Sequence, residues 1–492
     1  MSKNNEELFK NVIGHAKEYG FVFPSSEIYD GLSAVYDYGQ LGAELKNNLK
    51  TYWWKSMVQM NENIVGIDSA IFMHPKIWKA SGHVDGFADP MIDNKDSKKR
   101  YRADNLIEDK IARYQKDGKT DKAQKLQEDM DEALKADDLP KLKTLIEENA
   151  IVCPVSGTRN WTDVRQFNLM FSTQFGAMAE DSDEVYLRPE TAQGIFVNFL
   201  NVQKSGRMKI PFGIAQIGKA FRNEVIARQF IMRMREFEQM EMQFFVRPGT
   251  EMQWYAYWKE TRLKWHLAVG TPENKYRFHD HAKLAHYANA AVDIEFEFPF
   301  GFKEVEGIHS RTDFDLSQHQ QFSGKKMQYF DNDLNEEGKP FGNYIPYVIE
   351  TSIGLDRMFL LTMCNAYEEQ DLSSEERQDS RTVLHFHPAL APVKACVMPL
   401  IKKDGLPEKA REIMDQLKLD FNMQYDEKDS IGKRYRRQDA IGTPFCITID
   451  HQTLEDNTVT IRHRDSMEQE RVSFSDLSRI IGELVSWKNL LN

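Results

Sequence analysis

The segment from Ile214 to Phe245 constrains the fold more than any other part of this chain. Two strand-like stretches, 214–224 and 236–245, flank an arginine-rich loop. Polar, charged and aromatic residues share one face of each stretch when it is read with a period of two: Gln216, Arg222 and Glu224, then Phe237, Gln239, Glu241 and Gln243. If the stretches pair as an antiparallel hairpin, an arginine, an aromatic ring and carboxylates converge on one sheet surface. Such a surface suits a purine nucleotide.

Two other interpretations of this segment fit its residues less well. Solvated charge on an ordinary sheet would leave the matched polar faces of two strands unexplained. Residues 213–220 also approach the phosphate-loop pattern G-x-x-x-x-G-K-[ST], but Ala220 replaces the magnesium-binding hydroxyl residue. The spacer is strand-like, so we predict the first strand of a hairpin here.

The composition sets the class of protein. A chain of 492 residues is too long for one core, so two or three domains are expected. A net charge of −12 argues only weakly against a nucleic-acid partner, because basic residues cluster at two places: Arg228, Arg233 and Arg235, then Lys433, Arg434, Arg436 and Arg437. The absence of a long apolar run or a signal peptide, with four scattered cysteines, predicts a cytoplasmic protein that does not enter membranes.

Changes of character along the chain divide it into four parts. Residues 1–90 begin the main domain, and 91–160 form an insertion with charged helices between about 103 and 150. Residues 161–384 contain the candidate chemistry. Residues 385–492 alternate apolar strand-like runs with amphipathic helices, which predicts a compact α/β domain. The whole chain is predicted to be α+β.

Three segments together identify a family. The hairpin closely resembles motif 2 of the class II aminoacyl-tRNA synthetases, 344–357 resembles motif 3, and 38–49 resembles the dimer-forming motif 1. In detail the resemblance is to the glycine-specific members, although Thr351 and Gln40 stand where relatives commonly carry proline. It implies a class II antiparallel sheet flanked by helices, with a helical insertion and a C-terminal anticodon-binding domain.

The same resemblance implies an activity and its partners. The expected reaction is ATP-dependent ligation of glycine to tRNA(Gly) through glycyl-adenylate, carried out by a homodimer with Mg²⁺. Within this framework a synthetase for serine, threonine or proline is one rival, and an inactive tRNA-binding paralogue is another. The presence of both phosphate arginines and all pocket carboxylates speaks against the paralogue.

The ATP site is carried over from motifs 2 and 3. Arg222 is expected to bind the α-phosphate, Glu224 the adenine amine, and Phe237 the adenine ring. Arg357, on the first turn of a helix, would join its N-terminus in holding the polyphosphate. The full set of implied ATP contacts is Arg222, Asn223, Glu224, Met232, Arg233, Met234, Arg235, Glu236, Phe237, Glu304, Val305, Gly354, Leu355, Asp356 and Arg357.

Three of these assignments have further content. Arg233 and Arg235 could reach the outer phosphates or the tRNA end, or could be simple solvated charges. Glu304 is the implied magnesium ligand, since Mg²⁺ takes few carboxylates and prefers phosphate oxygens. Arg311 follows Glu304 by seven residues and is a candidate phosphate or substrate clamp.

The amino-acid site is implied by the turn 187–194 together with motif 3. Glu190, Glu241, Glu350 and Ser352 would surround the ammonium group of glycine and narrow the pocket until no larger side chain fits. Arg102 matches a substrate-contacting position but could equally form a salt bridge. The implied substrate contacts are Arg102, Glu190, Phe237, Glu238, Gln239, Met240, Glu241, Glu350, Thr351, Ser352, Ile353 and Gly354.

A zinc site is not expected. Asn94, Ser97, Cys153 and Ser156 occupy the places where some relatives carry two Cys-x-x-Cys pairs. Only one of the four is cysteine, and a single thiolate cannot hold structural zinc.

Overall fold

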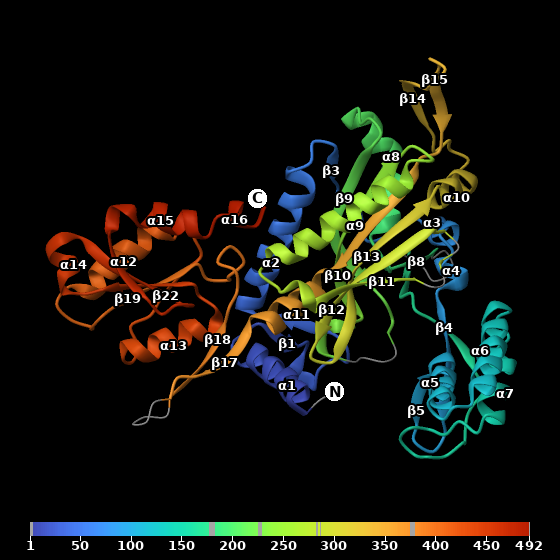
Figure 1. The fold of residues 1–492 in the computed structure, drawn as a ribbon, viewed down its shortest axis with the longest axis horizontal. Helices are drawn as coiled ribbons and strands as arrows, with labels where there is room; N and C mark the ends of the chain where they lie inside the picture. The colour runs from blue at the N-terminus through green and yellow to red at the C-terminus, as the bar shows by residue number, and fades with distance from the viewer. Residues whose placement is uncertain are drawn as a thin grey trace. The chain divides into compact units, whose positions relative to one another are not determined.

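A computed structural model describes residues 3–176, 183–224, 229–281, 284–285, 287–373 and 379–491. The chain forms two compact units (Figure 1). The first comprises Met1–Ala70, Glu190–Lys219 and Gln229–Asn492, and the second comprises Ile71–Pro189 and Ala220–Arg228. Each unit has its own core.

A seven-stranded sheet forms the centre of the first unit, in the order β11-β12-β13-β16-β10-β9-β3. β10–β16, β11–β12, β12–β13 and β13–β16 pair antiparallel, and β3 alone pairs parallel, with β9. The strands are β3 (Ile64–Gly66), β9 (Phe212–Phe221), β10 (Glu236–Val246), β11 (Tyr276–Asp280), β12 (Ala290–Phe298), β13 (Gly301–Thr312) and β16 (Tyr347–Gly354). This predominantly antiparallel sheet with flanking helices confirms the predicted α+β class.

β9 and β10 form the predicted hairpin rather than a phosphate loop. Lys219, near the end of β9, pairs with Glu236 at the start of β10 across 2.7 Å. At the other end, a Cβ on Gly213 would lie 3.0 Å from the sulfur of Met242, so the two strands run in opposite directions. Arg228, in the loop, lies outside the described residues.

Helices cover both faces of the sheet. The main core contains Trp53, Trp258 and Leu360 from three of them, packed against Met240 and Met242 of β10. A second cluster on the opposite face includes Phe196 and Phe199 of α8. The helices of this part are α1 (Lys3–Glu18), α2 (Gln40–Trp54), α8 (Ala192–Gly206), α9 (Glu251–Ala268), α10 (Phe314–Ser323) and α11 (Leu355–Ala366).

Short ribbons and single turns complete this part of the unit. The ribbons are β1 (Val22–Pro24) with β2 (Tyr36–Tyr38), β14 (Tyr329–Leu334) with β15 (Pro340–Tyr344), and β17 (Tyr367–Asp371) with β18 (Ser380–Leu384). The turns are η1 (Glu27–Tyr29), η2 (Lys55–Gln59), η3 (Phe230–Met232) and η4 (Glu273–Lys275).

The C-terminal part of the first unit has a five-stranded sheet, in the order β20-β19-β21-β22-β23. Its elements are β19 (Ala395–Pro399), α12 (Leu406–Leu417), β20 (Met423–Tyr425), α13 (Ile431–Ile441), β21 (Phe445–Ile449), α14 (His451–Asp456), β22 (Thr458–His463), β23 (Gln469–Ser473), η5 (Phe474–Asp476), α15 (Leu477–Leu484) and α16 (Lys488–Leu491). This part has a core of its own. Leu390, Val393 and Leu490 belong instead to the main core.

The second unit contains the predicted charged helices, packed around a small core. Its elements are α3 (Pro75–Ala80), α4 (His83–Gly86), β4 (Ala88–Asn94), β5 (Lys99–Arg102), α5 (Ala103–Lys116), α6 (Thr120–Lys135), α7 (Leu139–Glu148), β6 (Arg165–Asn168), β7 (Ser172–Phe175) and β8 (Asp183–Tyr186). Leu106, Met130 and Leu145, one from each long helix, are buried together. None of the described helices in either unit is long and apolar enough to cross a membrane.

Candidate active site

One face of the central sheet is lined by polar side chains. Because neighbouring residues of a strand point to opposite faces, Gln239, Glu241 and Gln243 of β10 lie opposite the buried methionines. The register pairs Glu241 with Ser352 and Gln243 with Glu350, which brings two strands' polar residues together. β13 adds His309 directly beside Glu350.

The three predicted pocket carboxylates meet in a bonded network on this face. The Gln243 amide donates to Glu241 and to Glu350, each at 2.7 Å. The hydroxyl of Thr191 donates to Glu241. The turn before α8 brings in Glu190, which accepts from Gln193 at 3.0 Å. Strand pairing and one helix start therefore gather carboxylates that are up to 160 residues apart.

Arg311 balances part of this negative charge. Its guanidinium donates to Glu350 at 2.9 Å and to Asp315 at 2.9 Å, and the side chain is buried. Arg311, the candidate phosphate or substrate clamp, therefore has its guanidinium bonded to two carboxylates on the polar face of the sheet. Burial alone would raise the pKa of Glu350, but Arg311 and the His309 hydrogen bond hold that pKa below its ordinary value.

No cation among the described residues balances Glu241 in this way. Burial raises the pKa of Glu241 well above its ordinary value, and the nearby Glu350 and Glu190 raise it further. This shift favours the protonated form of Glu241. An ammonium group entering the pocket would favour the ionised form of Glu241 and so would displace its proton.

Arg357 and Glu304 meet at another edge of the sheet. Arg357 Nη1 lies 2.9 Å from a Glu304 carboxylate oxygen, and its Nε donates to the Met232 carbonyl oxygen at 3.4 Å. Gly354 gives the arginine room, since a Cβ there would come within 3.2 Å of Arg357 Cδ. Phe237 lies half-buried at the margin of the main core.

Several residues carried over from the motifs direct their side chains away from the polar face. Strand alternation places Met240, Val305 and Ile353 in the core, and the turn η3, the segment after it and the start of α11 bury the others. The apolar ones are Met232, Met234, Met240, Val305, Ile353 and Leu355. Thr351 pairs with Met242 and is buried with this group. Only the main chain of these residues remains for substrate contacts.

Glu238 and Asp356 lie on the face of the sheet that α2 covers. Glu238 forms ion pairs with Lys46 and Lys50 of α2, each at 2.7 Å. Asp356 accepts from Lys46 at 2.7 Å and from the Glu238 amide at 2.8 Å, and it also accepts from Tyr38. These two carboxylates therefore tie α2, which contains most of the motif 1 segment 38–49, to motifs 2 and 3, rather than facing the polar side.

The two loop arginines have different environments. The Arg235 guanidinium donates to the Ser33 carbonyl oxygen at 3.2 Å, and its amide donates to Ala34 at 2.9 Å. Arg233 is exposed. Arg235 thus holds the segment between η1 and β2, whereas Arg233 is accessible to a ligand.

Arg222, Asn223 and Glu224 belong to the second unit. Arg222 Nε donates to the Pro189 carbonyl oxygen at 3.0 Å, and its guanidinium lies over the Phe87 ring at 5.4 Å. The main-chain amide of Asn223 donates to the Leu169 carbonyl oxygen at 2.8 Å. These contacts fix the direction of the arginine within that unit.

Arg102 lies in the second unit as well. It forms ion pairs with Asp89 at 2.8 Å and with Asp104 at 2.6 Å. These bonds match the salt-bridge alternative, and about a third of the side chain remains exposed.

The four positions of the degenerate zinc motif gather in the second unit. Cys153 Sγ lies 3.3 Å from Ser97 Oγ and 3.5 Å from the Ser156 amide. Ser156 Oγ donates to Asn94 at 3.0 Å. Hydrogen bonds thus join the four positions at which some relatives carry cysteines.

Four further residues of the polar network were not singled out as site residues from the sequence: Thr191, Gln193, His309 and Asp315. The signal for His309 was present, because Gly307, His309 and Arg311 alternate along β13. Asp315 and Gln193 depend on helix packing, since Gln193 bonds Asp315 at 3.0 Å across α8 and α10. No local pattern reveals that contact.

The C-terminal basic cluster lies on α13, but most of it is occupied internally. Arg434 is buried and donates to the Pro399 carbonyl oxygen at 2.6 Å. Arg437 pairs with Asp426 at 2.8 Å, and Arg436 pairs with Asp379 at 3.0 Å. Lys433 is exposed. The sequence therefore overstated the positive charge available to a nucleic acid.

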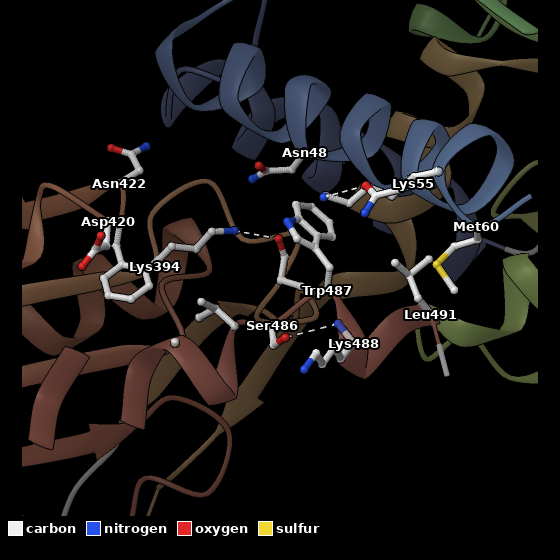
Figure 2. A pocket seen from close by; sticks show the side chains of 15 residues that line it. Asn48, Lys55, Met60, Lys394, Asp420, Asn422, Ser486, Trp487, Lys488 and Leu491 are labelled. Atoms are coloured by element: carbon white, nitrogen blue, oxygen red, sulfur yellow. Dashed lines mark hydrogen bonds between the residues drawn. The ribbon is translucent and has the colours of Figure 1, made fainter. Parts of the chain in front are cut away.

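A separate hollow of about 930 Å³ lies between the end of α2 and the C-terminal helices (Figure 2). Lys394 and Trp487 line it, and the Lys394 ammonium donates to the carbonyl oxygens of Ala389 at 2.6 Å and Ala391 at 2.9 Å. It shares no lining residue with the carboxylate network.

The chain matches three family models. The tRNA synthetase class II core domain (G, H, P, S and T) covers residues 171–366, and the anticodon binding domain covers 394–484. The glycyl-tRNA synthetase insertion domain 1 covers 89–126 and 118–169. These matches identify the chain as a class II aminoacyl-tRNA synthetase.

Curated relatives extend over almost the whole chain. It is 53% identical to a glycine–tRNA ligase of Chlorobaculum tepidum over 96% of this chain and 98% of that protein. It is 52% identical to those of Staphylococcus haemolyticus, over 97% and 99%, and Macrococcus caseolyticus, over 98% and 100%. The chain belongs to the glycine–tRNA ligase family.

Proposed function

We propose that this chain ligates glycine to tRNA(Gly) in two steps. The carboxylate of glycine attacks the α-phosphorus of ATP, forming glycyl-adenylate and releasing pyrophosphate. The terminal ribose hydroxyl of the tRNA then attacks the activated carbonyl, and AMP leaves. The observation that carries this proposal is the network of Glu190 with the buried Glu241 and Glu350 on the central sheet.

The network accounts for selection of glycine. A buried Glu241 without a cation beside it gains most from an arriving ammonium group, whereas Glu350 is already balanced by Arg311. The side chains joined by Gln243 leave little room at the α-carbon of the substrate. Excluding larger amino acids by size needs no editing site, because no smaller amino acid exists.

ATP would be held mainly by positive groups. We assign Arg222 to the α-phosphate, where charge grows in the transition state, and Arg357 to the polyphosphate. Glu304, about half exposed, is a suitable oxygen ligand for the Mg²⁺ that accompanies ATP and would neutralise phosphate charge. Arg233 is an additional candidate for the outer phosphates, and Phe237 for the adenine ring.

The remaining assignments concern domains and assembly. We take 1–90 and 161–384 as the catalytic domain, 91–160 as the insertion, and 385–492 as the anticodon-binding domain. A homodimer is proposed, with a contact that includes Ile28, Tyr29 and Leu32, which are 88%, 80% and 57% exposed between strands β1 and β2. The four unpaired cysteines fit a cytoplasmic location.

Amino-acid-dependent ATP–pyrophosphate exchange tests the proposal. Glycine should support exchange, whereas alanine and serine at the same concentration should not. Exchange that is strongest with serine, threonine or proline would overturn the assignment of substrate. An absence of exchange with every amino acid, together with retained tRNA binding, would favour the inactive paralogue.

A further inference from the structure

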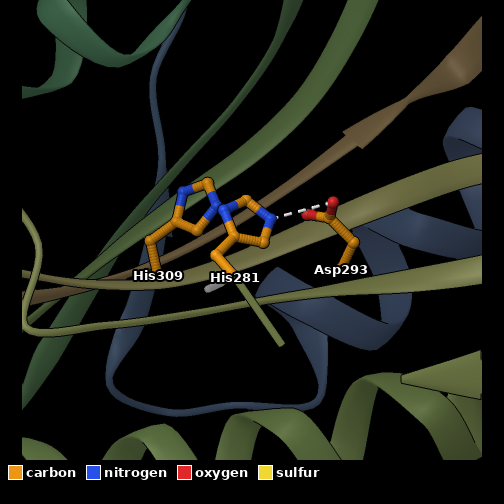
Figure 3. A group of neighbouring side chains, drawn as sticks. All are labelled: His281, Asp293 and His309. Atoms are coloured by element: carbon orange, nitrogen blue, oxygen red, sulfur yellow. Dashed lines mark ion pairs between the residues drawn. The ribbon is translucent and has the colours of Figure 1, made fainter. Parts of the chain in front are cut away.

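Three side chains on neighbouring strands form a group that the proposed reaction does not use. They are His281, which follows β11, Asp293 of β12 and His309 of β13 (Figure 3). One ligand atom from each lies within 4.8 Å of the other two. In the described part of the chain, no other three His, Cys, Asp or Glu residues meet this spacing.

Two of these side chains are already held in place. His281 Nε2 lies 2.9 Å from a carboxylate oxygen of Asp293. His309 Nδ1 lies 2.7 Å from Glu350, so a carboxylate fixes the orientation of this ring. Imidazole ligands of protein metals commonly have such a carboxylate partner on the nitrogen that does not bind the metal. This bond leaves Nε2 as the nitrogen of His309 that could coordinate.

Gly307 leaves space where the ligand atoms approach each other. A Cβ on this residue would lie 3.3 Å from His309 Nε2 and 3.7 Å from Asp293 Oδ1. Both atoms therefore border the same position above the strand. A larger residue would fill part of this space.

We propose that His281, Asp293 and His309 bind a divalent first-row transition metal of the zinc type. Two borderline imidazole ligands with one carboxylate suit Zn²⁺ or Co²⁺, whereas Mg²⁺ prefers oxygen ligands alone. Metal–nitrogen bonds of about 2.0–2.1 Å place tetrahedral ligand atoms roughly 3.3 Å apart. His281 is one-third exposed, so its ring can move closer, and water would complete the coordination.

Metal at this site would be linked to the carboxylate network. A metal on Nε2 keeps His309 neutral, with its Nδ1 proton directed to Glu350. The bound ion would thus fix Glu350, a pocket residue under the proposed function. Only this link rests on that function, because metal binding itself can be measured without glycine, ATP or tRNA.

Co²⁺ titration of the full-length chain, first stripped with a chelator, tests the proposal. Visible absorption should report one bound Co²⁺ per chain without thiolate bands, and Zn²⁺ should displace it. His281→Gln and Asp293→Asn should each weaken binding at least about 10-fold. His279→Gln is the matched control, because it removes an imidazole from β11 that bonds Glu295 rather than the proposed site.

The outcomes separate a built site from surface binding. Loss of affinity in His281→Gln with no change in His279→Gln supports the site. Absence of saturable Co²⁺ binding, or equal affinity in the wild type and His281→Gln, would overturn it. His281 is partly exposed, so its substitution remains informative even if Asp293→Asn lowers stability.

Discussion

Arg311 donates to Glu350 across 2.9 Å, and both side chains are almost completely buried. This ion pair reduces the negative charge of the acidic pocket, because Arg311 balances Glu350, one of its three carboxylates. Asp315 orients the guanidinium from the other side. Arg311 is therefore assigned as a positioning residue for Glu350.

Arg311→Met should destabilise the protein, because it leaves Glu350 and Asp315 buried without their cation. Removing one partner of a buried ion pair costs about 3–5 kcal/mol. Arg277→Met is the matched control, since its pair with Glu295 is about half exposed on the arginine side. That change should cost about 1 kcal/mol or less. Urea denaturation of both variants gives the comparison, and equal losses would contradict the assignment.

Arg222→Ala should abolish adenylate formation and leave the fold intact. Loss of one donor to developing transition-state charge costs roughly 3 kcal/mol, or about a 100-fold or greater loss of rate. ATP–pyrophosphate exchange measures this step, and circular dichroism checks folding. Wild-type exchange in the variant would remove Arg222 from the phosphate site.

Glu241→Gln should change the pH dependence of stability. The folded pKa of Glu241 is raised, so the native state binds a proton that the unfolded state has released. Stability of the wild type should therefore fall as pH rises above the unfolded pKa of about 4.3, by up to roughly 1.4 kcal/mol per pH unit.

The glutamine variant lacks this titration. Its unfolding free energy should rise relative to the wild type across the same window, which urea denaturation at pH 5, 6, 7 and 8 can follow. Below pH 4 the difference between the two proteins should become constant. Parallel curves from pH 5 to 8 would mean that Glu241 is ionised in the native state.

The variant Asn94→Cys, Ser97→Cys, Ser156→Cys should bind one zinc ion with Cys153. The four positions are already adjacent, so four thiolates can complete a tetrahedral site. Co²⁺ should produce thiolate-to-metal charge-transfer bands in the triple variant. The double variant that retains Asn94 is the control and should bind more weakly. Identical spectra for the two would show that position 94 does not reach the metal.

Lys433→Glu should weaken tRNA binding without changing the KM for ATP, because Lys433 is exposed on α13. Loss of one phosphate contact should lower the salt dependence of binding by about one ion. Lys264→Glu, an exposed charge reversal on α9, is the control. KM values for tRNA and ATP measure the effect. An equal rise of both KM values in Lys433→Glu would contradict a specific role in tRNA binding.

The hairpin was accessible from the sequence because its information is local. A period of two separates Gln239 and Glu241 from Met240 and Met242, and the structure keeps that separation on β10. The start of α11 after Gly354 follows from a strand, a glycine and an apolar helical run. The residues carried over from the class II motifs include both faces of each strand. The side chains of Met240 and Ile353, for example, lie in the core.

The sequence by itself determined the α+β class, the hairpin, and the carboxylates and arginines that line or border the site. The hairpin follows from residue spacing within about a dozen positions, where backbone geometry sets the direction of each side chain, and the other site residues follow from the resemblance to the class II motifs. Only the tertiary structure decided that Arg311 balances Glu350, that Asp356 holds Lys46, and that Arg434 is buried. Those partners come from separate elements, and packing chooses among many possible opposite charges the one that can be desolvated at bonding distance.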